Sequence, residues 1–369
     1  MTKARDIADL GGVTTRLDQV GNSDGALSNR NRVINGAMQV AQRGISSTTN
    51  SGYVTVDRFR ISNGSVGNLT TTQESTNGPS GVSKYSMKVT ATNTASLPAG
   101  SDGWIRYVIE TKDIENLTLS DPSKHFTVSF YVKCSDTGQS SIGVTSGDFG
   151  SAQYVSPFTI ANANTWQRVS VTIPCSSVLS NVSGDLGLRL YWDIGAGTTY
   201  QTSSTNQWVT GGKYASSGNL QITGVNGRYL QITGVQLELG DTSTDFEHIS
   251  FGDQLQKCQR YYQFLSDDDY NSSDAAVASY VDWNGGIGYS IVYFPNGKMR
   301  TRPSITKSAL NTFTTLQADE APEPTSMTIG GTSTHNFELR FESAATDTAG
   351  QAGWLRFKSG GKLTFDAEL

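Results

Sequence analysis

The stretch NLQITGVNGRYLQITGVQLELG, residues 219–240, contains the phrase LQITGV twice, in copies that begin at Leu220 and Leu230. Each copy alternates apolar and polar residues, as a β-strand with one buried face does. Between the copies lies Asn226–Gly227, a dipeptide that type I′ hairpin turns favour because both central residues need positive φ. The stretch therefore predicts a β-hairpin.

The second copy changes phase along its length. Leu230 and Ile232 are apolar at even positions, whereas Val235 and Leu237 are apolar at odd positions. The change falls at Gly234, and a glycine inside a strand commonly marks a β-bulge or a sharp bend. We expect a bulged core strand here, with the first copy as an added hairpin arm.

The composition of the 369-residue chain is typical of an all-β protein. Charged residues make up only 17% of it, glycines number 39, and Ser, Thr and Asn are abundant. These residue types favour strands, turns and loops over helix interiors. The length is sufficient for two domains.

Strands with alternating apolar residues recur from residue 32 to about residue 250. Three of them are HFTVSFYVKC (125–134), WQRVSVTIP (166–174) and LGLRLYWD (186–193). Alternation indicates that one face of each strand packs inward while the other meets water. Such strands, separated by Gly, Ser and Asn turns, predict a jelly-roll β-sandwich domain over residues 32–250.

The segment FGDQLQKCQRYYQF, residues 251–264, predicts a helical connector. Leu255, Cys258 and Tyr262 recur at helical spacing and would share one face. Residues 265–369 then return to strands, including HNFELRFES (335–343), and predict a second, smaller β-sandwich domain.

The last residues of the chain predict a terminal hairpin. Leu355 and Phe357 would lie on one arm, Leu363 and Phe365 on the other, with the turn at 359–361.

Residues 1–31 differ from the rest of the chain. The first ten, MTKARDIADL, favour a short helix that Gly11–Gly12 stops, and the following residues offer almost nothing to bury. Two interpretations stay open: a frayed terminus, or a short attachment arm that a partner orders.

Charge and hydropathy exclude several classes of protein. The net charge is −5 and the basic residues are scattered, which argues against nucleic-acid binding. No apolar run approaches the roughly 20 residues that span a bilayer, so we expect no membrane insertion. The N-terminus lacks the apolar core of a secretory signal, and the protein is expected to start in a cytoplasm. Cys134, Cys175 and Cys258 lie far apart and are expected to be buried thiols.

No catalytic or metal-binding motif is evident. The histidines His125, His248 and His335 accompany no GxSxG motif and have no Cys or His at zinc-ligand spacing. Acidic residues at 267–269 and in GDTSTD (240–245) offer oxygen ligands for calcium, but neither stretch has the spacing of an EF-hand loop, and a solvated acidic loop is the favoured interpretation. We predict no enzyme activity, no catalytic residue, no metal and no cofactor.

The region YQTSSTNQWVTGGKYASSGN, residues 200–219, has the composition of a glycan-binding surface. Tyr200, Trp208 and Tyr214 lie among amide and hydroxyl side chains, and sugar C–H faces stack on aromatic rings. The alternative is a long surface loop that packs an aromatic residue, Trp208 above all, back onto its own sheet.

Several phrases occur in an order that resembles a known family. They are NRVINGAMQVAQRG (31–44), YVTVDRF (53–59), ITGVQLELG (232–240), TDFEH (244–248), CQRYYQ (258–263) and MRTRP (299–303), together with KARDIADLGG (3–12). In these phrases the chain is similar to tail-fibre-like structural proteins of tailed bacteriophages, especially short-tailed phages of marine and freshwater bacteria. The doubled LQITGV departs from that pattern, in which one copy precedes QLELG.

The resemblance implies a virion protein with a jelly roll similar to carbohydrate-binding modules, commonly a homotrimer. It would assemble in the host bacterial cytoplasm and dock through residues 1–31 on other virion proteins, such as a tail hub, adaptor or capsid. We therefore predict a tail fibre or tail-associated adhesin that contacts a host-surface glycan. The alternatives are a capsid-bound head fibre or decoration protein and, less favoured, a polysaccharide depolymerase.

Overall fold

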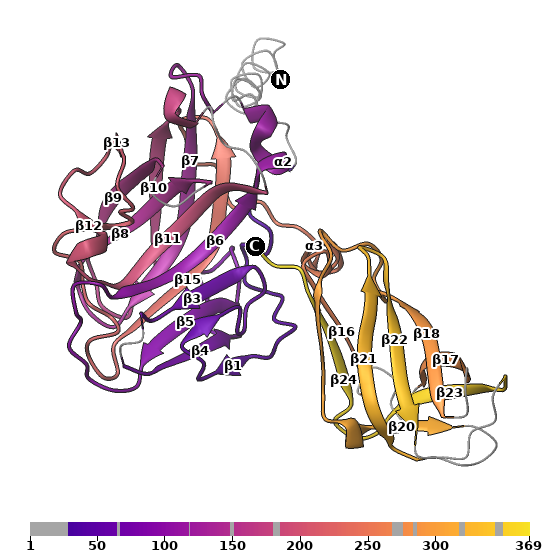
Figure 1. Ribbon diagram of the computed structural model, residues 1–369. Helices are drawn as coiled ribbons and strands as arrows, with labels where there is room; N and C mark the ends of the chain where they lie inside the picture. The colour runs from indigo at the N-terminus through magenta and orange to yellow at the C-terminus, as the bar shows by residue number, and fades with distance from the viewer. Residues whose placement is uncertain are drawn as a thin grey trace, which may run out of the picture. The chain divides into compact units, whose positions relative to one another are not determined.

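The computed structural model describes residues 29–64, 67–117, 119–147, 151–179, 185–267, 276–282, 286–316, 322–343 and 350–369. The described residues up to Gln254, with Leu369, pack as a first compact unit, and Leu255–Glu368 pack as a second (Figure 1). Most of the predicted N-terminal arm, residues 1–28, lies outside the described residues.

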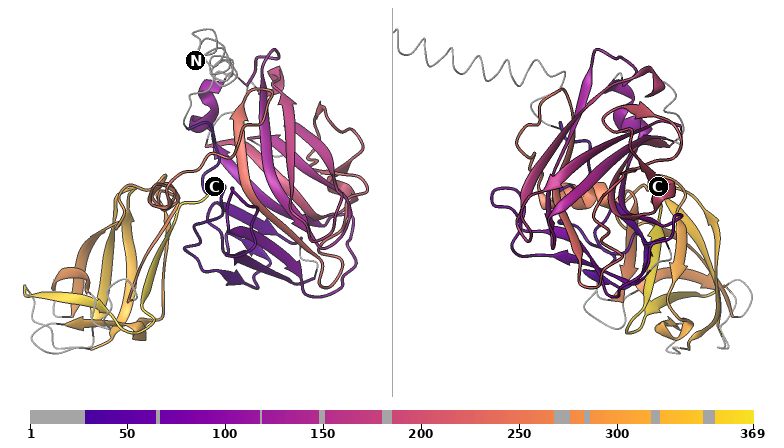
Figure 2. Two further views of the ribbon diagram at one scale, coloured as in Figure 1. Left: turned by 180° about the vertical axis from the view of Figure 1, so that it is seen from behind. Right: turned by 90° about the vertical axis from the view of Figure 1, so that its left-hand side faces the viewer.

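The first unit is a jelly-roll sandwich of two large antiparallel sheets, whose strands can be followed in Figure 1 and from two further sides in Figure 2. The six-stranded sheet has the order β1 (Ser46–Ser47), β4 (Leu69–Glu74), β5 (Ser86–Ala91), β15 (Tyr229–Leu239), β7 (His125–Cys134), β10 (Gln167–Pro174). The seven-stranded sheet has the order β13 (Trp208–Val209), β9 (Gln153–Ile160), β8 (Gly138–Ser146), β11 (Leu186–Ala196), β6 (Asp102–Glu110), β3 (Phe59–Ser62), β2 (Ser51–Gly52).

Short elements connect these strands. A two-stranded parallel pair joins β12 (Gln201–Thr202) to β14 (Ala215–Ser216). The helical turns are α2 (Thr111–Ile114), η1 (Glu115–Leu117), η2 (Ser177–Leu179) and η3 (Thr198–Tyr200).

The core of the first unit lies between the two sheets. Alternation along β7, β10 and β11 is confirmed, because their inward residues are buried in one hydrophobic cluster. Trp192 of β11 is fully buried at the centre, with its ring 5.5 Å from that of Phe130 in β7 and 6.2 Å from that of Phe59 in β3. These contacts join the two sheets through one aromatic group.

The second LQITGV copy forms a bulged core strand, as predicted. Pairing of β15 with β7 shifts register between Thr233 and Gln236, and Gly234 takes a φ of 59°. Leu230 and Ile232 before the bulge, and the apolar residues after it, all point into the core. The extra residue restores the inward direction after the change of phase.

The first LQITGV copy is not a strand, so the predicted hairpin is wrong. Its backbone turns instead, with the amide of Val225 donating to Ile222 O and that of Arg228 donating to Val225 O. Of the two central residues, only Gly227 has a positive φ, 80°. This matches a type II turn, because a type I′ turn needs positive φ at both central residues. The amide of Thr223 donates to Ile194 O at the end of β11, so this copy packs onto another strand.

The phrase NRVINGAMQ folds against the bulge of β15. Gly36 O accepts a hydrogen bond of 3.0 Å from the amide of Val235, and Asn31 Nδ2 donates to Val235 O at 3.0 Å. A Cβ on Gly36 would lie 2.1 Å from Val235 O, so the two backbones meet at a distance that only glycine permits.

The phrase TVDRF is buried rather than exposed. Asp57 accepts hydrogen bonds from the backbone and side chain of Gln42, and Arg58 donates to Val108 O at 2.8 Å. Phe59 packs into the core.

The second unit is a smaller β-sandwich. Its three-stranded sheet has the order β16 (Tyr262–Ser266), β24 (Lys362–Asp366), β19 (Ser304–Lys307). Its six-stranded sheet has the order β20 (Phe313–Leu316), β23 (Ala352–Phe357), β17 (Ala276–Asp282), β18 (Ile287–Tyr293), β22 (Asn336–Ser343), β21 (Pro324–Thr332), and η5 (Leu310–Thr312) precedes β20.

The predicted terminal hairpin is wrong. β23 pairs with β17 and β20, whereas β24 pairs with β16 and β19 in the other sheet. Leu355, Phe357, Leu363 and Phe365 are all fully buried between the two sheets. Inward alternation is the same for a hairpin and for two strands that face each other across a sandwich, so the pattern could not decide between them.

The helical connector is shorter than predicted. α3 runs over Phe251–Gln259, and Tyr262 begins β16 instead of extending the helix. Residues 262–266 pair instead with β24, which would lose this neighbouring strand if the helix continued.

The three cysteines are buried thiols, as predicted, and none of them is in a disulfide. Within the described residues, no helix is both long and apolar enough to cross a membrane.

Candidate functional site

The predicted aromatic loop folds onto the outer face of the seven-stranded sheet. Tyr214 is buried, with its ring stacked 5.1 Å from that of Tyr191 and 5.5 Å from that of Tyr200. Burial raises the pKa of Tyr214 far above its usual value. Because both faces of this ring are covered, Tyr214 supports the loop and offers no surface on which a sugar can stack.

Trp208 lies apart from the two tyrosines. Its ring is 5.6 Å from that of Tyr154, its Nε1 donates to Pro174 O at 2.7 Å, and it packs against the main core. The structure therefore brings Tyr200 and Tyr214 together and leaves Trp208 at β13, at the sheet edge.

Small residues and a buried carboxylate fix this loop to the sheet. A Cβ on Gly143 would lie 2.4 Å from Tyr214 O, so the loop backbone rests directly on β8. Asp193 accepts hydrogen bonds from Asn219 Nδ2 and from the amides of Gly195 and Ala196. Burial nevertheless raises the pKa of Asp193 above its ordinary value.

The outer face of the six-stranded sheet carries a different polar and aromatic surface. Lys88 of β5 pairs with Gln231 of β15, which pairs with Lys133 of β7, so three side chains form a row across three adjacent strands. We call this row, with the rings of Tyr229 and Trp166 beside it, the lysine strip.

Each lysine of the strip contacts an aromatic ring. Lys88 Nζ lies 4.6 Å from the centroid of Tyr229, and Lys133 Nζ lies 4.9 Å from that of Trp166. Desolvation, and then repulsion from Lys88, lower the pKa of Lys133. Glu74 lies 4.0 Å from Lys88 and partly balances the two ammonium groups.

Hydrogen bonds hold the rings in place. Tyr229 Oη donates to Asn164 Oδ1 at 2.6 Å, and Trp166 Nε1 donates to Asn77 O at 2.6 Å. Gln231 Nε2 donates to Ser86 Oγ at 2.6 Å. The rings and the central amide are therefore fixed before any ligand arrives.

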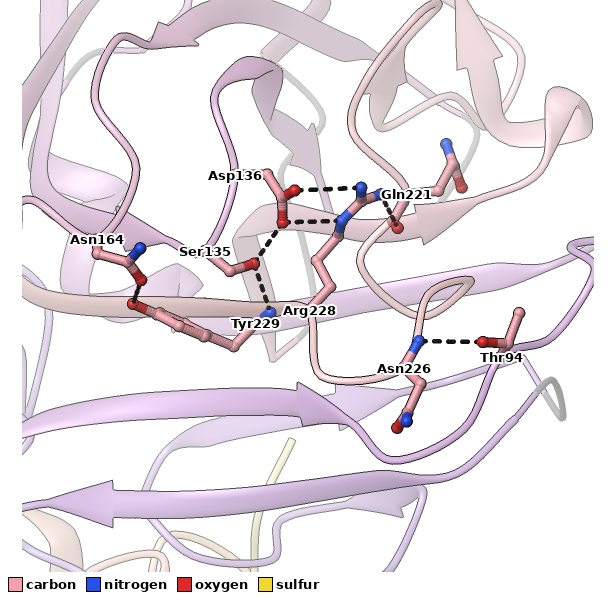
Figure 3. Close-up of polar contacts among 8 residues, drawn as sticks. All are labelled: Thr94, Ser135, Asp136, Asn164, Gln221, Asn226, Arg228 and Tyr229. Atoms are coloured by element: carbon pink, nitrogen blue, oxygen red, sulfur yellow. Dashed lines mark hydrogen bonds and ion pairs between the residues drawn. The ribbon is translucent and has the colours of Figure 1, made fainter.

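The turn that precedes Tyr229 is also fixed. Figure 3 shows Arg228 facing the carboxylate of Asp136, with Nε 3.0 Å from Oδ2, while Ser135 contacts both Asp136 and the amide of Tyr229. Hydrogen bonds from Ser135 and then Arg228 hold the pKa of Asp136 below its usual range. Arg228 also donates to Gln221 O, which ties the first LQITGV copy to this turn.

The lysine strip has the chemistry of a shallow sugar-binding surface. Tyr and Trp rings offer apolar faces, while the ammonium groups of Lys88 and Lys133 can meet sugar hydroxyls. Gln231 is buried beneath them and supports the row. Sequence reasoning missed it as a site, although the alternation along residues 125–134 left the face that carries Lys133 in water. The sequence alone gave no signal that Lys88, Lys133 and Tyr229 lie close together, because they are brought together only by strand pairing.

The described residues contain no group of three or more His, Cys, Asp or Glu side chains placed to hold a metal ion. Of the acidic residues at 267–269, Asp267 accepts a hydrogen bond from the amide of Gly360. Asp268 and Asp269 lie outside the described residues.

Fold and surface together define a two-sandwich β-protein with a jelly roll in its first unit. No family model matches the chain, and no curated protein matches its sequence.

Several solved structures are similar to it over part of its length. The enzymatically active domain of tailspike protein 4 from bacteriophage CBA120 is 12% identical, with a TM-score of 0.30 over 57% of this chain and 21% of that one. The xylan-binding domain CBM22-1 from Paenibacillus barcinonensis is 12% identical, with a TM-score of 0.27 over 55% and 99%. The family 11 carbohydrate-binding module from Clostridium thermocellum is 12% identical, with a TM-score of 0.24 over 57% and 95%. This chain thus spans about a fifth of the tailspike domain and nearly all of the two modules. These similarities concern the fold alone.

Proposed function

We propose that the first unit binds a glycan on the lysine strip. The observation that carries this proposal is the fixed arrangement of Tyr229 and Trp166 beside Lys88 and Lys133 on a rigid sheet. Aromatic faces beside polar groups that are already oriented lose little freedom on binding. The strip replaces the loop residues Tyr200, Trp208 and Tyr214 as the preferred contact surface.

A glycan array tests this assignment. We expect Tyr229→Ala combined with Trp166→Ala to weaken binding about a hundredfold, roughly tenfold for each stacking ring. Tyr200→Ala is the matched control, because it removes a half-buried ring from the loop of residues 200–219 and should leave binding unchanged. Circular dichroism checks folding of each variant. Equal binding by the double variant and the wild type would remove the strip as the site.

At the level of the whole protein, we propose a non-enzymatic structural protein of a phage virion, either a tail fibre or a tail-associated adhesin. The support is the ordered set of phrases from NRVINGAMQVAQRG to CQRYYQ. A capsid-bound head fibre or decoration protein has the same support, and residues 1–31 would dock on other virion proteins in either case. Electron microscopy of labelled virions distinguishes the two positions, and release of reducing ends from host envelope would instead indicate a depolymerase.

We also propose self-association, as a homotrimer, through the outer face of β17, β18 and β23. Large apolar side chains are exposed together there: Val281, Tyr289, Ile291, Tyr293 and Trp354. Strand β22 borders this face with charged side chains, Glu338, Arg340 and Glu342, and Arg340 pairs with Glu342 at 3.1 Å. An apolar centre with a polar rim is the composition of a subunit interface.

Substituting the centre of this face tests the proposal. We expect Ile291→Asp to convert the oligomer to monomers, because a buried unpaired carboxylate opposes association. Ser304→Asp, on the exposed face of β19 in the other sheet, should leave the oligomer intact. Light scattering after size-exclusion chromatography measures both, and a wild-type protein that is monomeric at micromolar concentration contradicts the proposal.

A further inference from the structure

Three arginines from three adjacent strands gather on the outer face of the seven-stranded sheet. Arg60 of β3 lies directly opposite Arg106 of β6. Arg106 in turn lies opposite Tyr191 of β11, and Arg189 is two residues before Tyr191 on the same face. With strands about 4.8 Å apart, the three guanidinium groups cover roughly 10 Å across the sheet. We call these three residues the arginine face.

Among the described residues, no acidic side chain forms an ion pair with these arginines. Within the part of the chain that the structure describes, none of the three arginines forms an ion pair or a hydrogen bond, and the Nε atom of each is buried without a partner. Asp102, on the same strand as Arg106, lies within 3.4 Å of Ser62 Oγ. Asp193 is buried and accepts hydrogen bonds from Asn219 of the loop and from the amides of Gly195 and Ala196.

The arrangement opposes stability unless a ligand meets it. Like charges directly opposite each other on neighbouring strands repel. Trp104 offsets part of this repulsion, because the Arg106 and Arg60 guanidinium carbons lie 4.9 and 5.9 Å from its ring. The same contacts hold the two guanidinium groups in fixed positions on the sheet. Two cations held in place side by side without an acidic partner, next to a third, are the pattern of a binding site rather than of a structural network.

We propose that the arginine face binds an acidic polysaccharide, with Arg60, Arg106 and Arg189 contacting its oxyanion groups. A guanidinium presents parallel N–H donors that match carboxylate and sulfate oxygens in pairs. The charge of the face requires a negative ligand. Its extent across three strands fits a polymer that carries repeated anionic groups better than a single small anion. This site lies on the opposite sheet from the lysine strip and does not depend on that strip binding glycan.

The test measures binding of the full chain to three soluble polymers by affinity electrophoresis at low salt. Polygalacturonate presents carboxylates, dextran sulfate presents sulfates, and unmodified dextran is neutral. The test variant is Arg60→Gln with Arg106→Gln. The control is Lys84→Gln with Lys112→Gln, two exposed lysines of the same unit, which changes the net charge equally.

We expect the wild type to bind at least one acidic polymer and to bind neutral dextran at least tenfold more weakly. The arginine variant should bind the acidic polymer at least tenfold more weakly than the wild type, while the control changes less than twofold. The acidic polymer that is preferred identifies carboxylate or sulfate as the recognised group. An equal loss in the control, which would indicate general charge attraction, overturns the proposal, as does wild-type binding to neither acidic polymer.

Two further measurements keep the result interpretable. The thermal midpoint of the arginine variant should stay equal or rise, because repulsion is removed, whereas a fall would indicate a structural role and count against the proposal. Lys88→Gln with Lys133→Gln should leave acidic-polymer binding within twofold. If that variant alone loses binding, the lysine strip is the acidic site and the arginine face is not.

Discussion

Gly36→Ala is expected to lower the free energy of unfolding of the first unit by about 3 kcal/mol. The new Cβ would lie 2.1 Å from Val235 O, so the NRVINGAMQ segment must move away from β15. Movement breaks the Gly36–Val235 and Asn31–Val235 hydrogen bonds, each worth about 1 kcal/mol, and adds overpacking of about 1–3 kcal/mol. Calorimetry of the full chain should show a shift in one transition only.

Gly100→Ala is the matched control for this substitution. Nothing lies within 4 Å of a Cβ built on Gly100, and its φ is not positive. The same chemical change should therefore alter stability by less than about 1 kcal/mol, and reduced freedom of the unfolded chain favours a gain. Equal midpoints for Gly36→Ala and the wild type would show that the segment does not pack on the bulge as described.

Trp192→Ala is expected to cost about 3–5 kcal/mol, the usual range for removing a large buried aromatic side chain. The ring is fully buried and contacts Phe130 from one sheet and Phe59 from the other. Its loss leaves a cavity between two sheets that cannot both collapse into it. Because the transition of the first unit should shift by many degrees, calorimetry measures the effect directly.

Two variants accompany this prediction. Trp192→Phe keeps most of the ring and removes an indole N–H that has no hydrogen-bond partner among the described residues, so we expect less than half the cost. Trp166→Ala makes the same truncation at the surface and should cost about 1 kcal/mol, mainly its hydrogen bond to Asn77 O. A Trp192→Ala effect no larger than that of Trp166→Ala would mean that the two sheets do not share this core.

The sequence by itself determined which residues point inward. Alternation along residues 125–134, 166–174 and 186–193 predicted three strands and their buried faces, and the phase change at Gly234 predicted the bulge. These features are local, because the side-chain period of a strand and the φ that a glycine allows depend on a few neighbouring residues. The all-β class and the order of a jelly roll before a smaller sandwich followed from the same signals.

Only the tertiary structure decided which strands pair. The two LQITGV copies have the same letters, yet one is a core strand and the other a turn, because their long-range partners differ. The terminal strands separate into two sheets for the same reason. Pairing depends on contacts between residues distant in the chain, which a pattern of period two does not encode.

Both candidate surfaces are likewise defined by strand pairing in the tertiary structure. Arg60, Arg106 and Arg189 look like scattered basic residues along the chain, and Lys88, Gln231 and Lys133 are equally dispersed. Each group becomes a surface only where three adjacent strands set its members side by side. Alternation in the sequence placed Lys133 and Arg189 on the outer faces of their strands, and the pairing of strands decided which side chains lie beside them.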